Sequence, residues 1–167
     1  MPVVRGGKVV ADPWVVVADE APVPPDRPAV VSLARWHNER TALAQRQAPL
    51  GVRLKSGDAA AEIAADLRHF ALVVLEFPKF NDGRGFSAAR LLRERYGFKG
   101  EIRAAGHLIR DQLQFLARCG VDTLEAPDES WAEKWRIAQE EISVVYQPAA
   151  DARRPALALR HLPRAAQ

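Results

Sequence analysis

Cysteine is almost missing from this sequence, since Cys119 is the single one among 167 residues. One thiol can form no internal disulfide, and it cannot supply the thiolates of a four-cysteine zinc site or of a common iron–sulfur cluster. Long apolar runs are missing too: no stretch of about eighteen apolar residues occurs, and the N-terminus has no apolar signal core. We therefore expect a cytoplasmic protein with no membrane span and no membrane partner.

Several signatures of catalysis and metal binding are also absent. The sequence contains no GxxxxGK[ST] phosphate loop, no GxGxxG dinucleotide turn and no GxSxG serine motif. Cys119 is predicted to be a small buried hydrophobe rather than a nucleophile. His107 and Asp111 lie one helical turn apart, but two ligands without a third are weak grounds for a metal. We therefore predict no cofactor and no metal. Three other histidines lack a catalytic spacing and are predicted to be structural or exposed: His37, His69 and His161.

The formal net charge of +3 comes from the C-terminal end. Basic and acidic side chains balance over the first 150 residues, and the excess lies in four arginines that oppose Asp151: Arg153, Arg154, Arg160 and Arg164. Residues 148–167 are therefore predicted to be a basic, flexible tail. A body without net charge makes nucleic acid an unexpected partner.

What is present indicates one globular domain with an N-terminal extension. Hydrophobic residues make up 48% of the chain and charged residues 27%, which is typical of a soluble domain of this length. Prolines gather in residues 18–28, where they exclude a helix interior or a central strand. Residues 1–28 are therefore predicted to be a β appendage and linker, with Val9–Val10 and Trp14–Val17 as a short hairpin or edge strands. The main domain is predicted over residues 29–147.

From Ala29 onward, short apolar runs alternate with amphipathic helical segments. Residues 71–77, ALVVLEF, are nearly continuous in apolar and β-branched side chains, as a central parallel strand requires. Residues 29–33 fit either a strand or the entry to a helix that runs to Gln47. Other strands are predicted at 51–54, 101–105 and 121–126. We therefore predict an α/β fold whose mainly parallel sheet is built from about four successive βα units, either open or curved like part of a barrel.

The helices are predicted from caps and from apolar spacing. Asp58 and Ser87 are placed to cap two helices, and a third begins near Asp128 or Ser130. Two stripes are expected to face the core. Their members are Ile109, Leu113, Leu116 and Ala117, ended by Gly120, and Trp131, Trp135, Ala138 and Ile142.

The loop after the strand at 71–77 carries the most chemistry. It runs from Glu76 to Ser87, and its turn residues explain its glycines without any function. A second loop, residues 103–112, follows the next strand and contains His107. Because parallel strands end at the same edge of a sheet, we expect the two loops to converge on one rim, with Arg84 and His107 on the same side.

An anion would fit such a rim, because arginine, lysine and backbone N–H groups at a helix start all bind oxyanions. The candidate ligand-binding residues are Lys79, Asn81, Asp82, Arg84, Gly85, Ser87, Arg103 and Arg110. His107 and Glu76 are the candidates for proton transfer. A structural alternative stays open, in which His107 is a cap or a surface group and Arg110 pairs locally with Asp111.

Residues 75–122, LEFPKFNDGRGFSAARLLRERYGFKGEIRAAGHLIRDQLQFLARCGVD, resemble a bacterial family called domain of unknown function 934. The stretches FPKFNDGRGFS and GHLIRDQ carry the resemblance, which extends from about Val30 to Tyr146. Members are often labelled oxidoreductases of sulfite reduction. The resemblance implies a role in assimilatory sulfur metabolism beside a haem-containing sulfite or nitrite reductase, and it carries over no catalytic residues.

Two hypotheses follow. In the first, the protein is an accessory component of sulfite reduction that binds a small anion or the reductase at the rim. In the second, it is an oxidoreductase or another small-molecule enzyme that acts on an oxyanionic substrate at the same rim.

Overall fold

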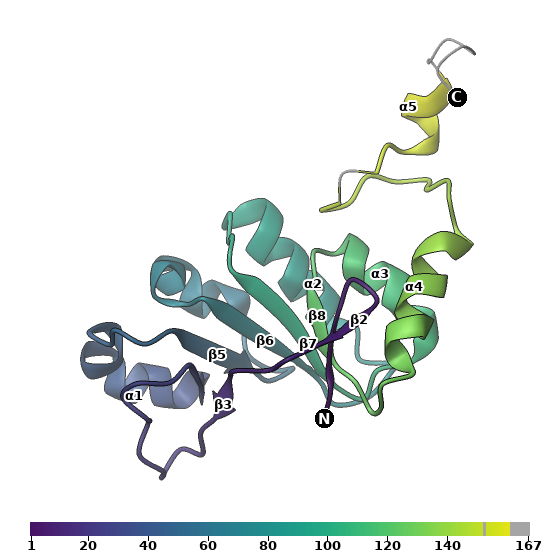
Figure 1. The fold of residues 1–167 in the computed structure, drawn as a ribbon. Coiled ribbons are helices and arrows are strands. Elements are labelled where there is room, and N and C mark those ends of the chain that lie inside the picture. Colours follow the sequence, from purple (N-terminus) through teal and green to yellow (C-terminus); the bar gives the residue numbers. More distant parts are fainter. Residues whose placement is uncertain (152, 161–167) are drawn as a thin grey trace.

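The computed structural model describes residues 1–151 and 153–160, and its strands join in one curled sheet. The strands are β1 (Val3–Arg5), β2 (Lys8–Val10), β3 (Val15–Val16), β4 (Ala29–Ser32), β5 (Leu50–Leu54), β6 (Leu72–Phe77), β7 (Glu101–Gly106) and β8 (Thr123–Glu125). Their order across the sheet is β2-β1-β8-β7-β6-β5-β4-β3 (Figure 1). Since β2 and β3 stand at its two ends, the sheet is open.

Helical segments connect these strands. They are α1 (Leu33–Ala44), the 3₁₀ helix η1 (Ala60–His69), α2 (Arg84–Arg90) with its π-helical continuation η2 (Leu91–Arg95), the 3₁₀ turn η3 (Arg110–Gln112) with α3 (Leu113–Arg118), α4 (Trp131–Glu141) and α5 (Ala156–Arg160). Of the helices in the described ranges, none has the length and apolar character needed to span a membrane.

The sheet is mixed, and the prediction of a mainly parallel sheet needs correction. The strands from β3 to β8 pair in parallel, but β1 is antiparallel both to β2 and to β8. The β1–β2 pair is antiparallel because a two-residue turn joins the strands at Gly6 and Gly7, whose φ angles of 55° and 77° suit a tight hairpin. Of the two alternatives for residues 9–10 and 14–17, the hairpin is wrong and the edge strands are confirmed, because β2 and β3 lie at opposite edges of the sheet.

Several predicted elements are confirmed, with shifted ends. Residues 29–32 form a strand, and α1 follows because the Ser32 hydroxyl accepts the N–H of Arg35 at 3.0 Å. Trp131, Trp135 and Ala138 are buried, whereas Ile142 lies beyond the end of α4 and is 53% exposed. Of the other stripe, Leu113 and Leu116 are buried and the rest is half-buried.

Two predicted helix caps were wrong. Asp58 accepts the N–H of Lys55 at 2.8 Å and closes the loop before η1, which has no side-chain cap. Ser87 lies inside α2, because the Asp82 carboxylate accepts the N–H of Arg84 at 3.2 Å and starts the helix three residues earlier.

Helices cover one face of the sheet. The strands β4 to β8 follow one another in chain order, and right-handed crossovers then place successive helices on the same side. On that side the main core includes Trp36, Ile63, Leu92 and Leu116 from the helices and Val31, Val52, Val73, Ile102 and Leu124 from the strands. Alternate strand residues face the other way and form a small separate cluster: Val30, Leu72, Val74 and Ala105.

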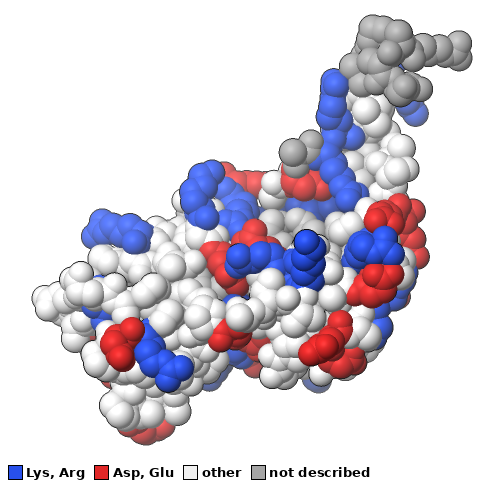
Figure 2. Space-filling view, in the orientation of Figure 1, with Lys and Arg blue, Asp and Glu red and all other residues white. Residues whose placement is uncertain are grey.

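The N-terminal segment crosses this second face. It runs from β2 at one edge to β3 at the other (Figure 1). Trp14 in this segment packs on the small cluster. Beside it, the Arg103 guanidinium donates to both oxygens of Asp12 at 2.9 and 3.1 Å and to Glu101 at 3.0 Å. Basic and acidic groups are intermingled over the face seen in Figure 2.

The start of the tail is attached to the helices. Arg118 of α3 donates to the carbonyl of Gln147 at 2.6 Å and to Asp151 at 3.2 Å. Arg153 donates to the carbonyls of Gln139 and Ile142. Beyond these contacts α5 projects from the body (Figure 1). Of the predicted tail, residues 152 and 161–167, which include His161 and Arg164, lie outside the described residues.

The substitution Asp12→Ala should lower the free energy of unfolding by about 1–3 kcal/mol, because it removes two charge-assisted hydrogen bonds from the buried Arg103 while Glu101 still neutralises the charge. Urea unfolding followed by tryptophan fluorescence measures the change. Asp26→Ala, at an exposed linker residue, is the control and should change stability by less than about 0.5 kcal/mol. Equal stability of the two variants would contradict the structural role of the ion pair.

Candidate functional site

The two predicted loops lie together at the carboxyl ends of β6 and β7. The N–H of His107 donates to the carbonyl of Phe77 at 2.7 Å. The imidazole stands edge-to-face against Phe80 with ring centroids 6.0 Å apart, and the Gln112 side chain donates to the Phe80 carbonyl at 2.6 Å. These contacts join loop 78–83 to the residues after β7, as the parallel strands led us to expect.

The prediction that Arg84 and His107 lie on the same side is wrong, because Arg84 lies on the other side of loop 78–83, toward β5. Arg84 lines a small hollow with Lys55, Ser56 and Glu76. Its Nε and Nη2 donate to the two oxygens of Asp82 at 2.9 and 2.7 Å. This ion pair, with a hydrogen bond from Ser56, holds the pKa of Asp82 well below its ordinary value, and Asp82 in turn raises the pKa of Arg84.

The other arginines of the predicted anion site also have carboxylate partners. Arg110 Nη2 donates to Glu141 of α4 at 2.9 Å, and Glu141 raises the pKa of Arg110. Arg103 is not at the rim, because it faces the opposite side of the sheet with a side chain only 4% exposed. Burial lowers the pKa of Arg103, but Asp12 and Glu101 outweigh burial and raise it above the ordinary value. The positive charges of Arg110 and Arg103 are therefore neutralised within the fold.

The remaining predicted residues have simpler surroundings. Lys79, Asn81 and Ser87 are exposed, and within residues 1–151 and 153–160 no ion pair involves Lys79. Glu76 is half-buried at the end of β6. Gly85 is required by packing, since a Cβ there would stand 2.4 Å from Cζ of Phe77.

An aromatic cluster at the rim was missed by the sequence analysis. We use this name for two ring pairs at this edge, Phe80 with His107 and Phe86 with Phe115. Phe80 is 53% exposed and Phe115 is 48% exposed. The ring centroids of Phe86 and Phe115 are 4.9 Å apart. Phe86 also packs edge-on against the buried Phe77 at 5.2 Å. The phenylalanines of FPKFNDGRGF were a signal for this cluster, but Phe115 reaches it from α3.

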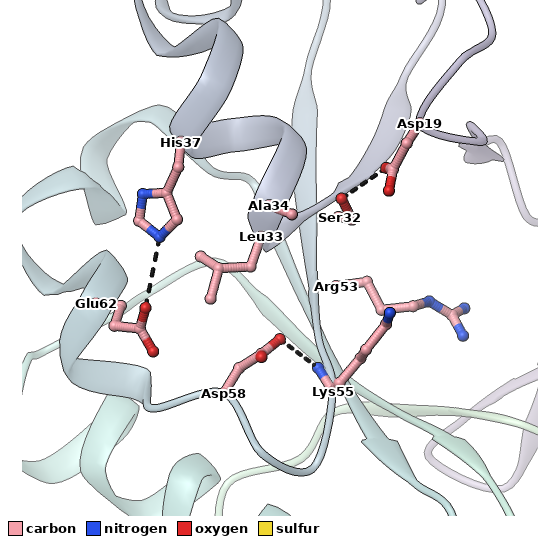
Figure 3. Close-up of a pocket in the computed structure, with 9 residues that line it drawn as sticks. All are labelled: Asp19, Ser32, Leu33, Ala34, His37, Arg53, Lys55, Asp58 and Glu62. Atoms are coloured by element: carbon pink, nitrogen blue, oxygen red, sulfur yellow. Dashed lines mark hydrogen bonds and ion pairs between the residues drawn. The ribbon is translucent and has the colours of Figure 1, made fainter.

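A cleft of about 290 Å³ opens at the carboxyl ends of β4 and β5. The start of α1 forms one wall, and the loop from β5 to η1 forms another (Figure 3). Its polar side chains are those of Asp19, Ser32, His37, Arg53, Lys55, Asp58 and Glu62. Sequence reasoning missed this cleft, although Arg53 and Lys55 alternate at the end of a predicted strand and therefore had to share a face.

His37 belongs to this cleft. Its Nε2 lies 3.5 Å from Oε2 of Glu62, and the side chain is about half exposed. The two residues are 25 positions apart in the sequence, so no local spacing indicated that they form a pair. The sequence-based interpretation of His37 as structural or exposed did not include a carboxylate neighbour.

Metal and thiol chemistry have little support in the described residues. Over residues 1–151 and 153–160 no three side chains of His, Cys, Asp or Glu are grouped as metal ligands. Cys119 is buried, and burial raises the pKa of its thiol to about 11. The prediction of a buried cysteine is confirmed.

The fold and this edge together define an α/β protein with loops at the carboxyl ends of its parallel strands, the usual place for ligands and partners in such sheets. A family model described as "Bacterial protein of unknown function (DUF934)" matches residues 51–157. The chain therefore belongs to the DUF934 family. The matched range contains the aromatic cluster and one wall of the cleft. No curated protein and no solved structure matches the chain.

Gly85→Ala should destabilise the fold by about 2 kcal/mol, because the added methyl group collides with the fully buried Phe77 ring. Thermal unfolding measures the loss. Gly57→Ala is the matched control, since a Cβ at Gly57 meets nothing within 4 Å, and it should change stability by less than about 0.5 kcal/mol. A Gly85 variant as stable as the control would mean that this glycine serves another purpose.

Cys119 should resist thiol reagents in the folded protein. With a pKa of about 11 in the folded state, the thiolate is scarce at pH 8, roughly one molecule in a thousand. Raising the pH increases the thiolate fraction, so reactivity with a chromogenic disulfide should rise with pH. Protein unfolded in urea is the control and should react at the rate of free cysteine. Rapid labelling of the folded chain at pH 8 would contradict the assignment.

Proposed function

We propose that this protein is a non-catalytic accessory component of assimilatory sulfite reduction, and that it docks on the sulfite-reducing enzyme through the aromatic cluster. The sulfur role is the one that the family resemblance implies. The observation that carries the docking role is the exposure of Phe80 and Phe115, two large aromatic rings, at an edge where hydrogen bonds join neighbouring loops. Exposed aromatic side chains beside arginine are typical of protein–protein interfaces.

The charges around the cluster support docking over capture of a small anion. Arg84 and Arg110 are bound to Asp82 and Glu141, so an incoming oxyanion has to compete with a carboxylate already in place. A protein surface has no such need, because paired charges suit the polar rim of an interface. Lys79, exposed beside Phe80, adds attraction toward an acidic partner surface.

The same pairing disfavours the enzyme hypothesis. An oxyanionic substrate at the rim would rely on Lys79, with both neighbouring guanidinium groups already engaged. His107 contacts Phe80 on the β7 side of the loop, whereas Glu76 and Arg84 share the hollow toward β5. The candidate proton-transfer groups therefore contact different surroundings on opposite sides of loop 78–83.

The double variant Phe80→Ala/Phe115→Ala should lose the partner. We expect recovery of a sulfite reductase subunit, identified by mass spectrometry, to fall at least about tenfold in co-purification from cells grown on sulfate as sole sulfur source. Val16→Ala is the control, because Val16 is 59% exposed on the far edge strand β3. It should leave recovery unchanged.

Thermal unfolding must show that the double variant is folded. Failure of the unmodified protein to recover a sulfite reductase subunit, or equal recovery by the folded double variant, would refute the docking role. Loss of recovery on Lys79→Ala alone, with the double variant still active, would assign docking to charge instead of aromatic contact.

A further inference from the structure

We propose that the cleft at the carboxyl ends of β4 and β5 binds a small zwitterion that carries an ammonium and a carboxylate on neighbouring atoms, as α-amino acids do. This site is separate from the aromatic cluster, and it does not depend on the docking role. The cleft volume of about 290 Å³ equals the space of roughly ten water molecules, which suits a small metabolite.

The cleft has a cationic wall that is prepared for a carboxylate. Arg53 and Lys55 alternate along and just beyond β5, and both side chains line the cleft (Figure 3). Glu125, from β8, binds Arg53 Nη2 at 3.0 Å and fixes the guanidinium in place. The Nε–H of the same guanidinium is buried and has no hydrogen-bond partner among the described residues.

Arg53 Nε is closed to solvent, so a ligand in the cleft can reach only the exposed part of this side chain, which is 25% exposed. Lys55 is exposed, and no ion pair within the described parts of the chain involves it. A carboxylate in the cleft would pair with Lys55 and lie beside the positive charge of Arg53. The side chain of Leu33, also in the cleft, provides an apolar contact for the rest of a ligand.

The acidic groups of the cleft exclude a simple anion. Three carboxylates, those of Asp19, Asp58 and Glu62, line the same space as the two cations. Glu62 is fully engaged, because it accepts the N–H of Ala59 and pairs with His37.

The other two carboxylates keep capacity for a ligand. Asp58 accepts from Lys55 N–H through Oδ2, and Asp19 accepts from the Ser32 hydroxyl at 2.6 Å through Oδ1. Each therefore has its second oxygen for an ammonium group. An anion alone is repelled by these carboxylates, and a cation alone is repelled by Arg53 and Lys55. A ligand with both charges matches both walls.

The test is an amide chemical-shift titration of the full chain with three probes: L-alanine, propionate, which lacks the ammonium, and ethylamine, which lacks the carboxylate. We expect L-alanine to give saturable shifts at Leu33–Arg35 and at Lys55–Asp58. Propionate and ethylamine should each bind at least about tenfold more weakly.

Variants assign the two walls. Lys55→Gln should weaken L-alanine binding at least about tenfold, and Asp58→Asn or Asp19→Asn should weaken it by about fivefold while the asparagine oxygen keeps the local hydrogen bond. Lys99→Gln, at an exposed lysine outside the cleft, is the matched control and should leave binding unchanged. The folded Phe80→Ala/Phe115→Ala variant should also bind L-alanine normally, which separates this site from docking.

Three results would overturn the proposal. The first is no saturable shift with L-alanine up to about 50 mM, far above the concentration at which a weak site of about 1 mM is filled. The second is propionate binding as tightly as L-alanine, which would make the cleft an anion site. The third is L-alanine binding that Lys55→Gln and both aspartate variants leave unchanged.

Discussion

The packing of helices on a single face of the sheet is the constraint on which the rest of the structure depends. Strands β4 to β8 follow their chain order, so the crossovers stay on one side and the opposite face needs another cover. The N-terminal segment covers it, with Trp14 on the small apolar cluster and Asp12 on the Arg103 guanidinium. The β1–β2 hairpin then protects the edge of β8, and β3 protects the edge of β4.

The same strand order gathers chemically useful side chains at one edge while giving them different surroundings. At β6 and β7 the arginines are neutralised by carboxylates and aromatic rings are exposed, a composition suited to a protein partner. At β4 and β5 a cleft holds groups of both charges, among them Lys55, Asp58 and Asp19. Lys55 lines both the cleft and the hollow beside Arg84, so the two regions adjoin.

Much of the fold could be predicted because its signals are local. The run ALVVLEF indicated β6, and Gly120, with a φ angle of 92°, follows the helix end that was expected. Errors arose where two local signals competed. Asp82 and Ser87 are both good caps, and the Asx turn at Asp82 prevailed. The first hairpin lies between β1 and β2, and its turn at Gly6-Gly7 is a local signal that the sequence analysis did not use.

The sequence by itself determined that short apolar strands alternate with helices and that the loops at 76–87 and 103–112 meet, because parallel strands end at a common edge. Only the tertiary structure decided which charges are left for a ligand. Arg110 pairs with Glu141, 31 positions away, and Arg103 pairs with Asp12, 91 positions away. No local sequence motif spans such separations. An ion pair needs only a few ångströms in space, and folding alone sets that separation.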